Sequence, residues 1–89
     1  MARLLVKGAE TSITAGQPNA TNCGTATCVR LWNNPDNGVI VVYTQTAGGV
    51  AIGSFSMTSG SVEIIEKNAT DEVYSTGGAL KFTKLGFTN

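Results

Sequence analysis

The chain has no histidine and little charge. Of its 89 residues 13% are charged, and 6 Lys and Arg balance 6 Asp and Glu. Without histidine, the Ser-His-Asp and Cys-His catalytic arrangements and the HExxH zinc helix are excluded. The balanced charge offers no basic surface to phosphate backbones or anionic lipid, so we expect neither nucleic acid nor a membrane as partner.

Long apolar runs and cysteines are also scarce. The apolar triplet at residues 4–6 is far shorter than a signal peptide or a membrane span, so we expect synthesis in a cytosol. The two cysteines, Cys23 and Cys28, would need two carboxylate ligands to hold zinc, an uncommon structural site. One loop thiol and one buried thiol are the simpler interpretation, and a disulfide formed in an oxidising medium is the alternative. We expect no metal and no cofactor.

Paired carboxylates are the remaining route to catalysis, as in glycoside hydrolysis. The close pairs are Glu63 with Glu66 and Asp71 with Glu72. Residues three apart on a strand point to opposite faces, so the first pair cannot converge on one bond. The second pair lies at a corner, where acidic residues ordinarily stabilise turns. We therefore expect a protein that is not an enzyme.

Short β-branched and aromatic runs between Gly, Asn, Asp and Pro clusters indicate a sheet protein. The 42% hydrophobic fraction and 11 glycines fit one folded β domain over residues 1–89. The pattern predicts an all-β fold, a small antiparallel β-sandwich or β-barrel of about seven short strands. The candidate strand segments are residues 3–7, 11–14, 28–33, 38–44, 50–57, 62–66, 72–75 and 80–87.

The segment NPDNG, residues 34–38, predicts a hairpin turn. Pro35 presets φ at the second turn position, Asp36 tolerates the corner, and Gly38 accepts a positive φ. A calcium loop is the alternative, but its ligands spread over about a dozen residues and end in a bidentate Glu, which is missing here.

Two further turns involve Gly60 and Asp71. Gly60 ends the turn between the segments at 50–57 and 62–66. Asp71 lies in the corner at residues 68–71, where we expect its carboxylate to accept backbone N–H bonds.

The run of five apolar residues at 39–43 suggests a contact surface. Val39, Val41 and Tyr43 share one strand face, and Ile40 and Val42 share the other. Both faces need cover, so the run is either a central strand under two layers or a strand with one face against another subunit.

The last strand segment shows the same two-sided pattern. Leu80 and Phe82 point one way and Leu85 and Phe87 the other, which predicts a bulge near Lys84 or cover on both sides. From the doubly apolar strands and the single tryptophan we predict an interface, made of Val39, Val41, Tyr43, Trp32, Leu85 and Phe87.

Trp32 and Tyr43 flank the predicted hairpin. They could form a cross-strand pair that stabilises the sheet, or a platform for stacking sugars. The polar stretch at residues 16–27 has nothing to bury, so it is either a contact loop or a plain solvated connection.

The segment GSFSMTSGSVEIIEKNATDEVYS resembles small virion structural proteins of tailed bacteriophages, of the capsid decoration and head-fibre type. The matching positions are Gly60, Val62, Ile64, Ile65, Lys67, Thr70, Asp71 and Val73. CVRLWNN, VIVVYT and the final LKFTKLGFTN are similar to the hairpin and tail of such proteins, so the resemblance runs from Cys28 onward.

The resemblance implies a non-enzymatic virion protein. It would be a capsid decoration or cement protein, or a head-fibre subunit, made in the host cytoplasm and located in the virion. Its partners would be the major capsid or another virion protein and further copies of itself, as a homo-oligomer. The alternatives are a tail or neck component and a small carbohydrate- or receptor-binding module, for which an open Trp32 would be the sign.

Overall fold

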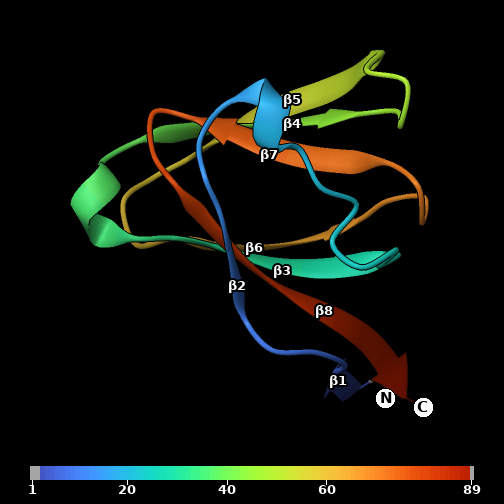
Figure 1. Cartoon of the computed structure of the whole chain (residues 1–89). Coiled ribbons are helices and arrows are strands. Elements are labelled where there is room, and N and C mark those ends of the chain that lie inside the picture. The colour runs from blue at the N-terminus through green and yellow to red at the C-terminus, as the bar shows by residue number, and fades with distance from the viewer. Residues whose placement is uncertain (1–2, 89) are drawn as a thin grey trace.

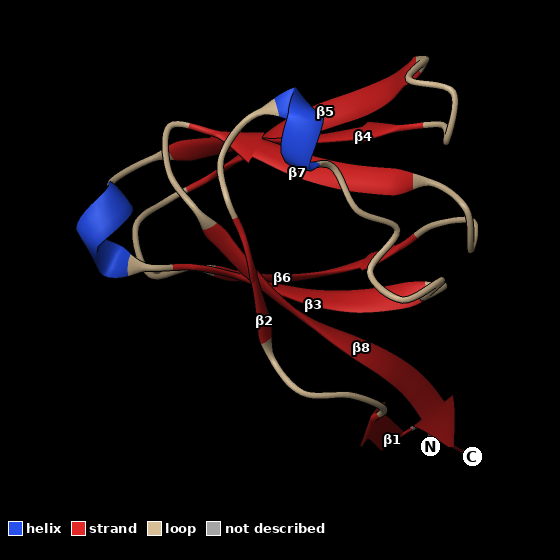
Figure 2. Cartoon of the chain, viewed as in Figure 1, coloured by secondary structure: helices blue, strands red, loops and turns tan. Residues whose placement is uncertain are grey.

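Two antiparallel β-sheets pack face to face in the computed structural model, which describes residues 3–88 and the side chains of residues 5–86 (Figure 1). The strands are β1 (Arg3–Val6), β2 (Thr11–Ile13), β3 (Cys28–Asn33), β4 (Ile40–Gln45), β5 (Ala51–Met57), β6 (Val62–Glu66), β7 (Glu72–Thr76) and β8 (Leu80–Thr88). The short 3-10 helices η1 (Gln17–Asn19) and η2 (Pro35–Asn37) lie in connections (Figure 2). The predicted all-β sandwich is confirmed; the sheets do not close into a barrel.

The two sheets differ in size. The larger sheet has the order β1-β8-β3-β6, with β2 also on β8, and the smaller sheet has the order β5-β4-β7. In Figure 1 the smaller sheet lies above the larger one. Strands β3, β5, β6 and β7 are each followed in the chain by a strand of the other sheet, so these connections cross the sandwich.

The core lies between the sheets and follows from period-two alternation. In β3, Val29, Leu31 and Asn33 point inward and are fully buried, while Arg30 and Trp32 point outward. Inward-facing residues of both sheets meet there. The core cluster consists of Ile13, Cys23, Ala26, Val29, Leu31, Ile40, Val42, Met57, Val73 and Leu80.

The NPDNG segment does not form a hairpin, because β3 and β4 belong to different sheets. It forms η2, which Pro35 opens and the side chain of Asn34 caps by accepting the N–H of Asp36 at 3.0 Å. Gly38 has φ 67°. Pro35, Asp36 and Gly38 are therefore turn residues as predicted, but the turn joins the two sheets.

Asn33 explains why the chain crosses between the sheets here. Its buried side-chain amide donates to the carbonyl oxygens of Gly38, Met57 and Thr58 at 2.8, 3.1 and 3.0 Å. These acceptors lie in the β3–β4 connection, at the end of β5 and in the turn after it. One polar side chain thus fastens two crossing connections at the same end of the sandwich. The predicted Gly60 turn is present, closed by the N–H of Ser61 on Thr58 O at 3.1 Å.

The stretch at residues 16–27 is not a free loop. The N–H of Gly16 donates to Ser75 O at 2.8 Å, and Thr21 and Val73 exchange both backbone bonds at 3.1 and 2.8 Å. The stretch therefore covers the outer edge of β7, and it places Cys23 and Ala26 in the core. The expectation that this stretch has nothing to bury is therefore wrong, because these two residues are buried.

Strand β8 is regular. Its register with β3 runs from Asn33↔Leu80 to Cys28↔Leu85 without a shift, so the predicted bulge near Lys84 is absent. Leu80 and Phe82 pack in or against the core, and Leu85 is buried on the opposite side of the sheet.

Candidate functional site

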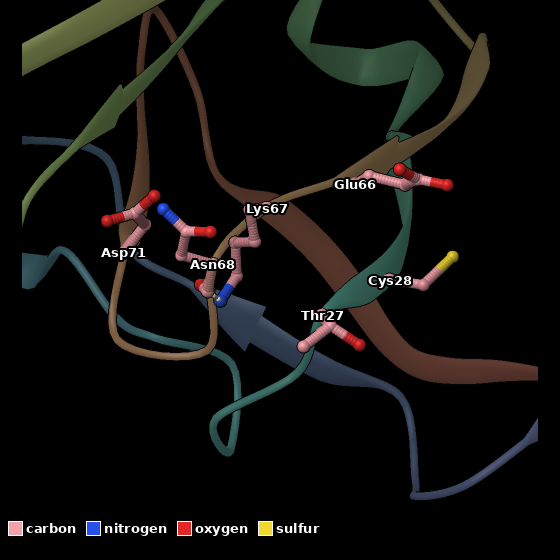
Figure 3. A pocket seen from close by; sticks show the side chains of 6 residues that line it. All are labelled: Thr27, Cys28, Glu66, Lys67, Asn68 and Asp71. Atoms are coloured by element: carbon pink, nitrogen blue, oxygen red, sulfur yellow. Dashed lines mark hydrogen bonds between the residues drawn. The ribbon is translucent and has the colours of Figure 1, made fainter.

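Lys67 follows β6, and its ammonium group lies in a cage of backbone carbonyl oxygens. Figure 3 shows its side chain beside Asn68. Nζ donates to Ala26 O at 2.7 Å and to Asn22 O at 2.8 Å. Longer bonds of 3.3 and 3.5 Å reach the carbonyl oxygens of Asn68 and Ala69. The donors of the ammonium are thus engaged with protein oxygens, and the cage joins residues 22–26 to the corner after β6.

The backbone that Lys67 holds is strained. Cys23, Gly24 and Thr25 have φ of 58°, 69° and 58°, all in the left-handed region. A non-glycine residue there costs on the order of 1 kcal/mol. Lys84 Nζ donates to Gly24 O at 2.9 Å, and the Cys23 side chain is buried. Two lysines and one buried thiol hold this turn in place.

An open hollow of about 540 Å³ lies beside the cage. Its lining residues are Thr27, Cys28, Glu66, Lys67, Asn68 and Asp71. In Figure 3, Cys28 and Glu66 point away from Lys67, so the chemically active groups do not converge on one point. Burial lowers the pKa of Lys67, while the charges of Cys23 and Asp71 act in the opposite direction. Since its donors are engaged, this amine stabilises the fold and is not presented to a substrate.

The Asp71 carboxylate does not have the predicted role. Among the described residues it accepts no backbone N–H, and the corner is closed by the Asp71 N–H donating to Asn68 O at 3.1 Å. The carboxylate instead interacts with the charge of Lys67. Asp71 is therefore a turn residue, but the turn is stabilised by its backbone and not by its side chain.

The carboxylate pairs do not form an acid–base site. Glu63 faces the side of Leu31 in β3 and Glu66 faces the side of Cys28, so they lie on opposite faces of β6. Glu72 accepts a hydrogen bond from Gln45 Nε2 at 2.9 Å. Within residues 3–88, no group of three or more Cys, Asp or Glu residues is arranged to hold a metal ion, and no helix has the length and apolar character to cross a membrane.

Cys23 and Cys28 are both free and both buried. Cys23 belongs to the core, whereas Cys28 faces outward from β3 beside Leu85. Burial raises the pKa of Cys23 to about 11, an effect that the charge of Lys67 opposes. Burial, and then the nearby Glu66 charge, raise the pKa of Cys28. Cys23 lies in a loop, as one interpretation of the sequence had it, but it is not an accessible thiol.

The side of the larger sheet that faces away from the smaller sheet carries many apolar groups, and we call it the outer face. Direct cross-strand partners share a face, so the register identifies its members. They are Val6, Ser12, Cys28, Arg30, Trp32, Val62, Ile64, Glu66, Lys81, Thr83 and Leu85. This set was not recognised as a surface from the sequence, although Val62 and Ile64 alternate with Glu63 as expected of one strand face.

Apolar side chains of the outer face are open to solvent. Val62 and Ile64 are 42% and 43% exposed and Val6 is 67% exposed. Between them, Cys28 and Leu85 are buried without belonging to the core between the sheets. Apolar groups gathered in this way are typical of a contact surface.

Trp32 also lies on the outer face, half-buried, with Lys81 Nζ 5.5 Å from the ring centroid. The expected pairing of Trp32 with Tyr43 is wrong, because the two strands belong to different sheets. Tyr43 instead stacks on its cross-strand partner Tyr74, with ring centroids 4.9 Å apart and planes inclined by 9°.

The predicted interface residues do not form one surface. Trp32 and Leu85 lie on the outer face of the larger sheet, whereas Val41 and Tyr43 point outward from the smaller sheet, on the opposite side of the sandwich. Val39 precedes β4 and is 63% exposed. The side chain of Phe87 lies outside the described residues. No protein-family model, curated protein or solved structure matches this chain.

Proposed function

We propose that this chain is a non-enzymatic structural subunit of a tailed-bacteriophage virion, a capsid decoration or cement protein or a head-fibre subunit. The resemblance of residues 28–89 to such proteins supports the location. The outer face supports the mode of action, which is binding to the capsid lattice and to other copies of the chain.

The outer face is the observation that carries the proposal. Val62, Ile64 and Val6 expose apolar groups on one side of one sheet, around the buried Leu85. Removing apolar surface from water contributes about 25 cal/mol per Å², and small-molecule sites are concave pockets, so apolar groups spread over a sheet face suit a protein partner better.

A carbohydrate- or receptor-binding module is the rival function. It requires an aromatic ring with an open face on which a sugar can stack. Lys81 occupies the vicinity of the Trp32 ring, and Tyr43 and Tyr74 stack on each other. These contacts favour the scaffold over the sugar-binding role.

A sedimentation assay tests the proposal. The labelled chain is mixed with particles of its phage assembled without it, and bound chain is recovered with the particles. We expect saturable binding by the wild type. The double variant Val62→Lys with Ile64→Lys should weaken it at least about tenfold, because it places two charges on the apolar surface.

The matched control is Ser54→Lys with Ser56→Lys, which places two charges at exposed positions of the edge strand β5 in the other sheet. It should bind like the wild type, and melting curves should show all variants folded. A wild type that stays in the supernatant, or that host polysaccharide retains in place of particles, would refute the virion role.

A further inference from the structure

The sheet edges of this sandwich are protected unequally. The edge of β7 is covered by Gly16 and Thr21, and the edge strand β5 pairs with β4 through a register shift at Thr44/Gln45. On the far side of β8, the described part of the chain contributes the short strands β1 and β2. Covers, bulges and short strands all discourage pairing with another chain. Strand β6, the last strand of the larger sheet, has five residues and a regular register, and no strand among residues 3–88 pairs with its outer edge.

The hydrogen bonds of β6 identify its open backbone groups. The N–H of Asn33 donates to Ser61 O and the N–H of Lys67 donates to Thr27 O, both at 3.0 Å. In an antiparallel ladder only alternate residues bond to a given neighbour. The odd-numbered residues therefore bond to β3, and the N–H and C=O groups of Val62, Ile64 and Glu66 point to the open edge.

We infer that β6 is a self-association strand, through which two copies of the chain pair antiparallel with Ile64 opposite Ile64 of the second copy. In this register Val62 of each copy faces Glu66 of the other copy. All open groups of both edges are then satisfied by roughly six backbone hydrogen bonds. The larger sheet continues across the two-fold axis, and the outer faces of the two copies join.

The charges of β6 select this register. With Ile64 opposite Ile64, each Glu63 faces Ile65 of the second copy, so no carboxylates oppose each other. Shifting the second strand by two residues in one direction places Glu63 opposite Glu63 of the second copy, which is unfavourable. Sliding the other way loses one of the three bonded pairs and places Ile64 opposite Glu66. The acidic residues thus disfavour one neighbouring alignment, and the loss of a bonded pair disfavours the other.

The inference deepens the proposed function, since it names the strand by which copies meet, but its test needs no virion. An edge contact of this length is small, so we expect the dimer to dissociate on dilution. On a capsid lattice, each copy of such a dimer would gain affinity from the attachment of the other.

Cysteine cross-linking tests both the edge and the register. Ile64→Cys should give a disulfide-linked dimer under mild oxidation, because bonded partners have Cα atoms about 5.5 Å apart. Val62→Cys and Glu66→Cys should each stay uncross-linked alone, since like residues lie about 13 Å apart along the strand, and should cross-link when mixed. All variants carry Cys28→Ala, because Cys28 lies directly opposite residue 66 and would form a disulfide with Glu66→Cys within one chain. The Cys28→Ala protein, in which only the buried Cys23 remains, is the control.

Proline supplies the second test. Ile64→Pro removes an N–H that points to the open edge and leaves the bonds to β3 intact, whereas Ile64→Thr keeps that N–H. Sedimentation over a range of concentrations should show the proline variant monomeric and the threonine variant still dimerising. Cross-linking of Ile64→Cys no faster than that of Glu66→Cys alone, or a proline variant that dimerises like the wild type, would overturn the inference. A chain that stays monomeric yet binds particles would refute this pairing and leave the proposed function standing.

Discussion

The ammonium of Lys67 lies 2.7 Å from the carbonyl oxygen of Ala26, a residue 41 positions earlier in the chain. Ala26 is fully buried and lies two residues before β3, while Lys67 directly follows β6, the strand paired with β3. One charged side chain thus closes the end of a strand pair and fixes the strained turn at Cys23–Gly24–Thr25.

Replacing Lys67 should cost stability. Lys67→Met removes the bonds to Ala26 O and Asn22 O and leaves their carbonyls without this partner, so we expect the free energy of unfolding to fall by about 2 kcal/mol. The control Lys81→Met removes only the contact with Trp32 and should cost about 0.5 kcal/mol. Urea unfolding measures both variants. Equal losses of unfolding free energy would show that the carbonyl cage of Lys67 does not stabilise the fold more than a surface contact does.

Asn33 should tolerate no acidic replacement. Asn33→Asp keeps the shape but replaces the donor to Gly38, Met57 and Thr58 carbonyls by a buried acceptor, so we expect a loss of at least about 3 kcal/mol. Asn34→Ala, which removes only the cap of η2, should cost about 1 kcal/mol. Thermal and urea unfolding check the pair, and a mild effect of Asn33→Asp would contradict the assigned role.

Two glycines should respond oppositely to alanine. A Cβ on Gly78 would lie 2.5 Å from Cγ of Asn37, whose amide donates to Ala79 O and Asn33 Oδ1, so Gly78→Ala should cost about 1–3 kcal/mol. A Cβ on Gly48 would meet only Thr46 Oγ1 at 3.8 Å, and Gly48→Ala should be neutral or slightly stabilising. Melting temperatures that rank the variants the other way would be inconsistent with this packing.

Stability should fall in alkaline solution through Cys23. Burial raises its pKa from 9.0 to about 11, so between these pH values the folded chain keeps a proton that the unfolded chain releases. The protonated Cys23 thiol contributes its full stability below pH 9.0. As the pH rises toward about 11, the free energy of unfolding should fall by on the order of 2 kcal/mol. The lowered pKa of Lys67 acts in the opposite direction and the raised pKa of Cys28 adds to the fall.

A comparison with Cys23→Ala isolates the Cys23 contribution, because the other groups remain in both proteins. The free energy of unfolding of the wild type should exceed that of Cys23→Ala by about 1–2 kcal/mol near pH 7.5, and this difference should vanish near pH 10.5. Urea unfolding with a reductant present measures the difference. A difference in unfolding free energy that stays constant across this pH range would contradict the burial of the thiol.

The sequence predicted the strands better than their partners. Period-two alternation placed β3 and β6 at their observed bounds and separated Ile40 and Val42 from Val41 and Tyr43. Local turn chemistry, however, is the same for a hairpin and for a connection that crosses between sheets. What distinguishes them at residues 34–38 is the inward-pointing Asn33 amide, whose acceptors lie up to 25 residues away.

The lysine cage could not be predicted for a related reason. Its ligands are backbone carbonyl oxygens, which every residue carries, and they meet only after residues 16–27 dock on β7. The outer face is partly predictable: the sequence points to Trp32 and Leu85 as interface residues, but it does not identify Val62 and Ile64 as part of the same surface. Their exposure depends on β6 being an edge strand, which is a property of the topology.

The most direct test of the account is hydroxyl-radical footprinting of the chain, free and bound to particles assembled without it. We predict that oxidation of Trp32, Val62 and Ile64 falls on binding, while Val39 and Ile52, which are 63% and 55% exposed away from the outer face, stay as reactive as in the free chain. Protection of Val39 and Ile52 with no change at Trp32, Val62 and Ile64 would contradict the claim that this protein works through the outer face of its larger sheet.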